Sequence, residues 1–492
     1  MTAALLCASA LGAQRPAPPV VPTDTLVIGL SEALRRGLQS GEESQLAEAT
    51  IEQAHHQASS AKSEIFPQLS GRLSYQRTLR TPFSSGSGFS LPDSLQFRPD
   101  SLASVDQRLA YLEKNTPNAG LSALSSLFSG LPFGQKNTYL ATLTVSQTVF
   151  DPAVFTGITI AREFEQMAQS EATEQRLDVA LRIVEAYFDA VLASRMEAIT
   201  SASAEQLAAQ LRQVTLVRAA GNASDLDVLK VDVDLQNIEP DRVAALNQRD
   251  IALLNLKRLT NISIDQPIRI ADSLATTGFR PIADATVRTL VDGAIARRAS
   301  IDAREHELSI RNAQVSLAKG AYLPKVSLSA NFGKQALPNN LLPSANQFRD
   351  DWNVGLAVQV PIFNGGKRRA DVQLADVQRR QTELQLAQLK ESVALDVAQQ
   401  RGELDRAAAL IRARAHTASQ AERVYSLTNL SYEKGLQTSL QLSDARLQLQ
   451  RSRANEAQAL HDYYIALAKL LRAAGAPVND FPAQRASTGG AP

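Results

Sequence analysis

Aromatic side chains, excess charge, long apolar runs and cysteine are all scarce in this sequence. Aromatic residues make up only 5% of the 492 residues, which argues against a compact core rich in large rings. The formal net charge is +1 and no block of positive charge occurs, so a nucleic-acid partner is not expected. No apolar run reaches the roughly 18 to 20 residues of a transmembrane helix. If the chain spans a membrane, it must therefore do so with strands.

The only cysteine, Cys7, lies in a short apolar start. Residues 1–13 resemble the end of a secretory signal peptide, with the small residues Ala8 and Ala10 near a cleavage point. The basic region that normally begins such a signal is missing, so a start further upstream and a plain apolar tail both remain open. A lipid anchor on Cys7 is disfavoured because residues 4–6 lack the small side chains of such a processing site. A mature chain without this segment would hold no cysteine.

The chain contains an internal duplication, which four pairs of matching segments reveal in the same order. The pairs are Ala61–Ser70 with Ala318–Ser327, Leu143–Asp151 with Leu356–Asn364, Arg218–Leu226 with Tyr432–Leu440, and Ala252–Leu259 with Ala466–Arg472. The spacing between these landmarks is preserved as well. Gly221 follows Phe150 by 71 residues, and Gly435 follows Phe363 by 72. The two halves are therefore expected to fold alike.

This duplication predicts the domain organisation. The first structural repeat covers residues 30–262, and the second covers residues 286–476. The rest is an extended lead-in rich in proline, a linker between the repeats and a disordered tail, over 14–29, 263–285 and 477–492, respectively.

Long helices are predicted in both repeats. Residues 158–220 contain neither Gly nor Pro, and apolar residues recur every seven positions, as in a coiled coil. The recurring residues are Leu177, Val184, Val191, Val397, Leu404 and Ile411. At ~1.5 Å per residue the long arms reach roughly 100 Å. The shorter arms, of about 40 and 30 residues, would cover the same length end to end, which favours a sleeve of parallel helices. Pro240 is expected to kink its helix.

Between the helical arms the apolar period changes to two. Four strands are predicted over 68–78, 138–149, 325–333 and 352–362, with outer loops over 79–137 and 334–351 and a short helical patch near 102–114. One apolar and one polar face is the pattern of an outer-membrane barrel, although a half-buried soluble sheet gives the same alternation. Four strands alone cannot close, whereas a trimer would supply twelve. Candidate aromatic girdles are Tyr75, Tyr139, Phe332 and Trp352 at one end of the strands, and Phe150 and Phe363 at the other.

The order and spacing of these features over residues ~26–476 resemble the TolC-like outer membrane efflux protein family. The resemblance implies a mixed α and β fold with a duplicated helix-strand-strand-helix repeat. Three chains would form one twelve-stranded outer-membrane β-barrel, surrounded by lipid and continuous with a long α-helical periplasmic barrel. The implied partners are a periplasmic adaptor protein and an inner-membrane pump of the RND or ABC type.

The function that this resemblance implies is passive efflux of small molecules from such a pump across the outer membrane. A type I secretion conduit for polypeptides is the first alternative. A soluble coiled-coil scaffold is the alternative from a different class. The exported substrate, the partner pump and adaptor, and the open or closed resting state stay open at this point.

The helix turns are the candidate functional site. Gly can supply the backbone geometry that reverses a helix, so an adaptor-docking tip is expected around Arg218, Gly221, Lys434 and Gly435. In the resembling family, the helices just after the second turn line a pore constriction. The residues at the matching places are Tyr432, Gln437, Gln441 and Asp444, with Asp225 and Asp227 as candidates in the first repeat. Two of these, Gln437 and Gln441, depart from the Arg and Asp of the family pattern, which argues against a strong cation-binding ring. An ordinary solvated carboxylate is the alternative for Asp444.

Two motifs suggest a phosphate-binding loop and a metal site, but their residues and spacing fit neither. Gly365-Gly366-Lys367 lacks the spacing of a phosphate-binding loop, and Arg368 stands where that motif needs Ser or Thr. His55 and His56 are adjacent on a helix, so their side chains diverge by about 100° and cannot hold one metal together. The other histidines are isolated in the sequence. We therefore predict no catalytic residue, no cofactor and no metal site.

Overall fold

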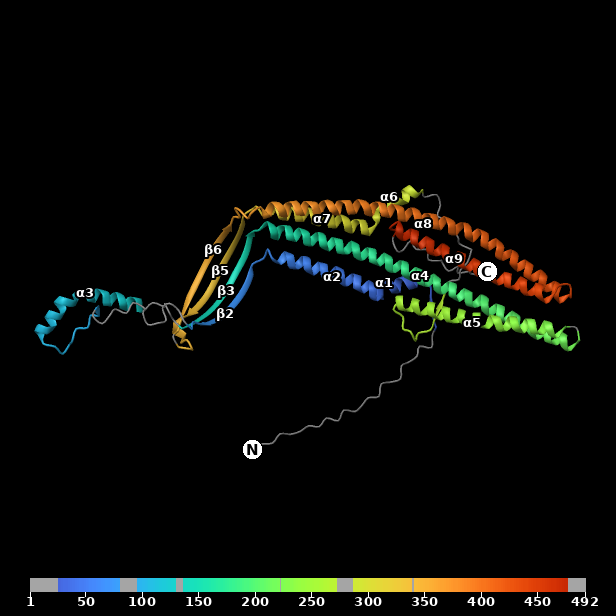
Figure 1. Ribbon diagram of the computed structural model, residues 1–492, viewed down its shortest axis with the longest axis horizontal. Helices are drawn as coiled ribbons and strands as arrows, with labels where there is room; N and C mark the ends of the chain where they lie inside the picture. Colours follow the sequence, from blue (N-terminus) through green and yellow to red (C-terminus); the bar gives the residue numbers. More distant parts are fainter. Residues whose placement is uncertain are drawn as a thin grey trace, which may run out of the picture. The chain divides into compact units, whose positions relative to one another are not determined.

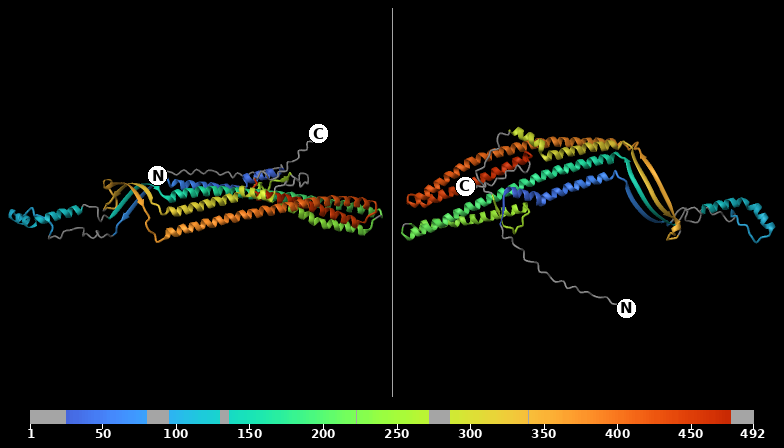
Figure 2. Two further views of the ribbon diagram at one scale, coloured as in Figure 1. Left: turned by 90° about the horizontal axis from the view of Figure 1, so that it is seen from above. Right: turned by 180° about the vertical axis from the view of Figure 1, so that it is seen from behind.

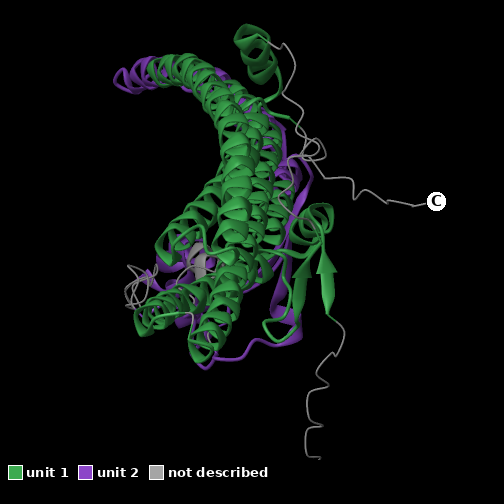
Figure 3. Ribbon diagram, turned by 90° about the vertical axis from the view of Figure 1, so that its right-hand side faces the viewer, with its two compact units in different colours: residues 1–56, 162–311, 377–492 green, residues 57–161, 312–376 purple. Residues whose placement is uncertain are grey.

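The computed structural model describes residues 25–79, 95–129, 136–221, 223–271, 286–338 and 340–476. The chain divides into two compact units, which are coloured separately in Figure 3. The helical unit contains residues 1–56, 162–311 and 377–492, and the sheet unit contains residues 57–161 and 312–376. Both units take segments from both sequence repeats. The repeats are therefore interleaved in space and do not form two separate domains.

A short parallel strand pair connects the predicted lead-in with the predicted linker. β1 (Leu26–Ile28) pairs with β4 (Ile268–Ile270), and Ile28 is fully buried in the helical core. We expected neither strand, because three residues are too few to show a period of two. The predicted signal over 1–13 and the predicted tail over 477–492 lie outside the described residues.

The helical unit consists of helices, and the longest of them run side by side (Figures 1 and 2). They are α1 (Leu30–Ser40), α2 (Glu42–Ser63), α4 (Pro152–Ala219), α5 (Asp225–Leu259), α6 (Val287–Arg297), α7 (Ala299–Gly320), α8 (Lys367–Glu433) and α9 (Ser439–Ala473). Helices α2, α4, α7 and α8 continue into the sheet unit. α4 has 68 residues and α8 has 67, which corresponds to about 100 Å each. α5 continues as one helix through Pro240, where we expected a kink.

The apolar residues that recur by sevens lie in the core of the helical unit. Leu177, Val184, Val191, Val397, Leu404 and Ile411 are all buried. Phe188 of α4 stacks on Tyr464 of α9 with ring centroids 4.7 Å apart. Burying a large apolar side chain contributes about 1.5–3 kcal/mol, so this stripe is a main source of helix association. In the described part of the chain, no helix combines the length and apolarity needed to cross a bilayer.

Each repeat contains a joint, where a break between two helices meets the end of a return helix. In the first joint, α1 and α2 are separated at Gly41, and Asn261, just after α5, donates its side-chain N–H to the backbone oxygen of Ser40 at 2.9 Å. In the second joint, α6 and α7 are separated at Arg298, and Gly475, just after α9, lies against the Arg298 backbone. Asn261 and Gly475 both have a left-handed backbone, with φ of 52° and 64°.

The second joint also contains a network of charged side chains. Glu174 of α4 accepts hydrogen bonds from Arg298 Nε at 3.4 Å and from Arg472 Nη2 of α9 at 2.9 Å. Arg298 Nη1 also donates to Asp396 of α8 at 3.1 Å, and Arg472 Nε donates to Asp178 at 2.8 Å. The side chains of Glu174 and Arg298 are only 16% and 10% exposed. This network therefore links three long helices to the α6–α7 break.

The sheet unit contains a four-stranded antiparallel sheet in the order β2-β3-β5-β6 (Figure 1). The strands are β2 (Gln68–Arg77), β3 (Asn137–Phe150), β5 (Lys325–Ala336) and β6 (Phe348–Gln359). The register places Val145, Ala330 and Val354 in one row across three strands, and Thr144, Asn331 and Asn353 in the next row. Because neighbouring residues in a strand point to opposite faces, one face is mainly apolar and the other mainly polar.

Three elements, β5, β6 and α3, differ clearly from the predicted boundaries. β5 and β6 extend three and four residues into the predicted loop 334–351, because the ladder continues through polar residues and Lys334 pairs with Asp350 at 2.8 Å. β6 ends at Gln359 instead of residue 362, since Pro361 has no N–H for the ladder. The predicted short helical patch is a longer helix, α3 (Val105–Ser129), which continues through Pro117.

The predicted aromatic residues at one end of the sheet form two cross-strand pairs in different rows of the register. Tyr75 and Tyr139 are opposite each other, with ring centroids 4.8 Å apart, and Phe332 and Trp352 are opposite each other at 4.1 Å. Tyr139 pairs with Ala336, however, and not with Phe332, so the two pairs are four residues apart, or about 13 Å along the strands. At the other end, a bulge sets Phe150 opposite Val326, and Phe363 lies beyond the end of β6.

Candidate functional site

Two tight turns join the long helices to the return helices. Gly221 lies between α4 and α5, and Gly435 lies between α8 and α9; both have a left-handed backbone, with φ of 81° and 72°. The Gly435 N–H donates to the carbonyl of Tyr432, and the Leu436 N–H donates to the carbonyl of Ser431, both at 2.9 Å. A residue with a side chain is strained at such a φ, so glycine fits both positions.

The return helices both begin with a capping box. Ser224 caps α5 and exchanges hydrogen bonds with Asp227, and Thr438 caps α9 and exchanges hydrogen bonds with Gln441. Gln441 Oε1 accepts from the Thr438 N–H at 2.9 Å. The side chain of Gln441, which we predicted at a constriction, therefore satisfies the start of its own helix.

A polar network connects α4, α5 and α9 near the turns, and it was not predicted from the sequence. Arg446 of α9 is buried and donates to Asp234 of α5 and to Gln210 of α4, both at 3.0 Å. Ser443 donates to the same carboxylate of Asp234. The only sequence signal was that Asp234 and Arg446 lie seven residues after Asp227 and Ser439, which also contact each other.

Asp227 and Tyr432 are electrostatically coupled at this site. Hydrogen bonds from the side chain and backbone of Ser224 hold the pKa of Asp227 below its usual value. Burial raises the pKa of the Tyr432 phenol, and the negative charge of Asp227 raises it further. At neutral pH Asp227 is therefore a carboxylate, and its charge favours the neutral form of the Tyr432 phenol.

The structure separates the other predicted site residues. Asp225 pairs with Arg218 across the first turn at 3.1 Å, and both side chains are exposed. Asp444 is exposed on α9, and it forms no ion pair with a described residue. Gln437 is half-buried in the second turn, and Lys434 is exposed beside Gly435. Of the six residues predicted for a constriction, Asp227 and Tyr432 are the pair that influence each other electrostatically.

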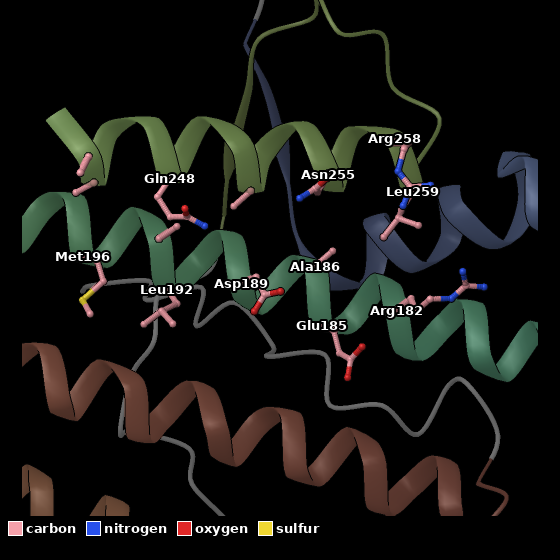
Figure 4. Close-up of a pocket in the computed structure, with 14 residues that line it drawn as sticks. Arg182, Glu185, Ala186, Asp189, Leu192, Met196, Gln248, Asn255, Arg258 and Leu259 are labelled. Carbon is pink, nitrogen blue, oxygen red and sulfur yellow. The ribbon is translucent and has the colours of Figure 1, made fainter.

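The two flanks of α4 differ in how they contact the return helices. A groove of ≈ 840 Å³ lies between α4 and α5, lined by apolar residues such as Leu192 and by polar residues such as Gln248 and Asn255 (Figure 4). Towards α9, Asp189 instead contacts His461 at 2.8 Å, and Glu185 pairs with Lys469 at 3.3 Å. His461 was predicted to be isolated, and its partners became visible only in the folded chain.

Charged partners also perturb this histidine. Burial alone would lower the pKa of His461, but its hydrogen bonds with Asp189 and Asp462 outweigh burial and raise the pKa. Within the described residues, no group of three or more His, Cys, Asp or Glu side chains has the arrangement of a metal site.

Residues 116–261 and 290–476 match the family described as outer membrane efflux protein. The chain is 25% identical over 348 residues to the alkaline protease secretion protein AprF of Pseudomonas aeruginosa, covering 69% of this chain and 70% of that protein. It is 20% identical over 337 residues to the outer membrane protein TolC of Vibrio cholerae, covering 68% and 76%, respectively.

A solved structure shows the same fold. The crystal structure of a membrane protein from Pseudomonas aeruginosa superposes with a TM-score of 0.68 at 20% identity, over 95% of this chain and 100% of that chain. This likeness confirms the predicted fold class, in which a helix-strand-strand-helix repeat occurs twice.

Proposed function

The chain belongs to the outer membrane efflux protein family, and we propose that it is the outer-membrane duct of a tripartite efflux system. It is an outer membrane protein with a large periplasmic extension, as the sequence predicted. In the proposed system, an inner-membrane pump of the RND or ABC type and a periplasmic adaptor protein deliver small molecules to the duct. The duct passes them outward without performing chemistry on them.

The two-faced sheet is the observation that supports this proposal most directly. On its apolar face Leu73, Val354 and Leu356 are 86%, 77% and 64% exposed. On its polar face Asn331 donates to Asn353 at 2.9 Å in a row of hydrogen-bonding side chains. An apolar face of this kind needs a cover, and the hydrocarbon of a membrane supplies one while water fills the polar side.

The sheet also needs more strands than one chain provides. β2 and β6 are its edges, and an open edge exposes a row of unpaired backbone groups. Three chains supply twelve strands, with β6 of each chain pairing with β2 of the next, so that no edge remains. A homotrimer with outer-membrane lipid around it is therefore part of the proposal.

We assign the docking of the adaptor to the turns at Gly221 and Gly435, where Arg218 and Lys434 are exposed. The constriction is assigned to the adjacent level of α5 and α9, where the charge of Asp227 acts on Tyr432 at the end of α8. Three copies of these carboxylates around a narrow pore would gather negative potential, as acidic rings do in cation channels. Asp444 would add to this ring.

Single-channel recording of the purified trimer tests these assignments. Asp444→Asn or Asp227→Asn is expected to lower the preference for cations, and Tyr432→Phe is expected to raise the resting conductance. Asp250→Asn, on an exposed part of α5 far along the chain from the turn, serves as the charge-matched control. Unchanged selectivity and conductance in all three variants would place the constriction elsewhere along the helices.

A polypeptide-secretion conduit is the second candidate, because the relative AprF is named for protease secretion. Deleting the gene and comparing the secreted proteins with the sensitivity to toxic small molecules separates the two cargo classes. Recovery of the chain only in the soluble fraction, without a trimer that resists mild heating in detergent, would instead favour the coiled-coil scaffold.

A further inference from the structure

Helix α3 carries an apolar stripe that is exposed in the described part of the chain. Leu102, just before the helix, and Val105, Leu109 and Leu112 within it follow each other at spacings of three, four and three residues. Their exposed fractions are 95%, 78%, 58% and 40%. On a helix this spacing places all four side chains along one line, as at the a and d positions of a coiled coil.

A different side of α3 is already occupied by the preceding segment. The Arg98 N–H donates to the Tyr111 hydroxyl at 2.8 Å, and the Phe97 N–H donates to the Ser122 hydroxyl at 2.9 Å. Phe97 also contacts the Tyr111 ring at 6.0 Å between centroids. Tyr111 and Ser122 are three turns apart on one line of the helix, about 130° away from the middle of the stripe. These contacts fix α3 locally but leave the stripe free.

The residues beside the stripe are complementary in charge. If Leu109 and Leu112 are a and d positions, Arg108 is a g position and Glu113 is the next e position. In a parallel coiled coil, a g side chain meets the e side chain five residues later on the neighbouring helix. A positive g and a negative e therefore favour a parallel contact between identical helices.

We propose that the α3 helices of three chains pack against each other through this stripe, with Arg108 of each chain paired to Glu113 of the partner subunit. The proposal rests on the homotrimer proposed above. Rotation about a threefold axis makes equivalent helices parallel when they follow the axis, which is the orientation that the charges favour. The insertion that holds α3 occurs only in the first repeat, so each trimer has three copies.

The short length of the stripe is not an obstacle in a trimer. Isolated helices below about 12–15 residues are marginal in water, and Pro117 limits the stripe to the first half of α3. Within an assembled trimer, however, the three copies are tethered at an effective concentration of the order of millimolar. Contact between them then needs no strong intrinsic affinity.

Cysteine cross-linking of the full-length trimer tests the contact. In a Cys7→Ser background, Leu109→Cys is expected to cross-link chains with a short bis-maleimide, joining up to two of every three chains. Lys114→Cys, on the opposite side of α3, is the matched control and is expected to cross-link at least fivefold less. Arg108→Glu should reduce the Leu109→Cys product several-fold, and adding Glu113→Arg should restore it.

Light scattering of the same detergent samples separates the two possible failures. If a trimer forms but Leu109→Cys cross-links no better than Lys114→Cys, the α3 contact is wrong and the duct proposal stands. If no trimer forms, both the duct proposal and the α3 contact are wrong. Cross-linking that survives Arg108→Glu unchanged would overturn the parallel charge pairing, and so would failure of the double reversal to restore it.

Discussion

The two joints of the helical unit occupy equivalent places in the two repeats, but different interactions hold them together. Their backbones are alike: the helix breaks lie at Gly41 and Arg298, with φ of −67° and −74°, and each return helix is followed by a residue with positive φ. The first joint relies on close packing, on side-chain hydrogen bonds to backbone oxygens from Asn261 and Ser44, and on an exposed Arg182–Glu43 ion pair. The second joint relies on the charged network around Glu174.

The comparison shows that both repeats have kept the backbone conformation of the joint and differ in the side chains that fill it. A left-handed residue after the return helix and an extended residue at the break are needed for the chain path, so both repeats retain them. The side chains that fill the joint only need to compensate one another. Close packing and a paired charge network are two solutions to the same problem, and they should respond differently to mutation and to pH.

The largest effect is expected from removing the central carboxylate of the second joint. Glu174→Ala removes the shared partner of Arg298 and Arg472 in a mostly buried site, while Asp396 and Asp178 still neutralise the two arginines, so the loss should be about 3 kcal/mol of unfolding free energy. Glu174→Gln keeps the shape and one acceptor, so its cost should be smaller. The midpoint of urea unfolding in detergent measures both.

At the first joint, the corresponding loss is expected to be much smaller. Asn261→Gly removes one exposed hydrogen bond to Ser40, which contributes only about 1 kcal/mol, and glycine fits the left-handed backbone at this position. Equal costs for Asn261→Gly and Glu174→Ala would contradict the distinction between a packed and a charged joint.

A substitution that adds a methyl group tests close packing at the first joint. A methyl group on Gly37 would overlap Cδ1 of Ile183 and lie 3.0 Å from the carbonyl oxygen of Leu259. Gly37→Ala should therefore destabilise the fold by about 1–3 kcal/mol. Gly402→Ala on α8 is the matched control, because an added methyl group there meets nothing within 4 Å and should stabilise the helix by about 0.5–1 kcal/mol. The thermal midpoints of both variants decide the point, and stabilisation by both would show that the joint has room.

A smaller effect is expected from pH, through the ionic contact of α9 with α4. Because the pKa of His461 is raised in the folded chain, its contact with Asp189 stabilises the fold fully below about pH 6.5 and loses this contribution as pH rises through the folded pKa. His461→Gln should reduce stability more at pH 6 than at pH 8.5. Urea midpoints of both proteins at the two pH values provide the measurement, and a difference that does not depend on pH would exclude the proposed ionic contact.

Much of the fold was readable from the sequence because its signals repeat over many residues. The seven-residue stripe through Val184 and Val397 averages over long helices, so it predicted the buried face correctly. Register between distant strands carries no such signal. The sequence could not show that Tyr139 lies opposite Ala336, four residues along the strand from Phe332.

The candidate site was less predictable because its residues meet across the fold. The reversal at Gly221 and Gly435 follows from local backbone chemistry, and it was predicted. The capping role of Gln441 was also visible in the Thr438-x-x-Gln441 pattern, but we gave it a role at the pore instead. Arg446 gave no local signal at all, since its partners Asp234 and Gln210 lie more than 200 residues earlier.

The assignment of the two sheet faces is the central claim, and a pair of neighbouring substitutions in β5 tests it most directly. Leu328 lies on the apolar face and Ser329 on the polar face, one residue apart. Leu328→Arg should impair insertion by about 2–4 kcal/mol if its side chain faces the middle of the bilayer, whereas Ser329→Arg should be tolerated beside water. The measurement is the amount of heat-modifiable trimer recovered from outer membranes. Loss of the trimer in Leu328→Arg alone is predicted, and equal recovery of both variants would contradict an outer-membrane duct built in this way.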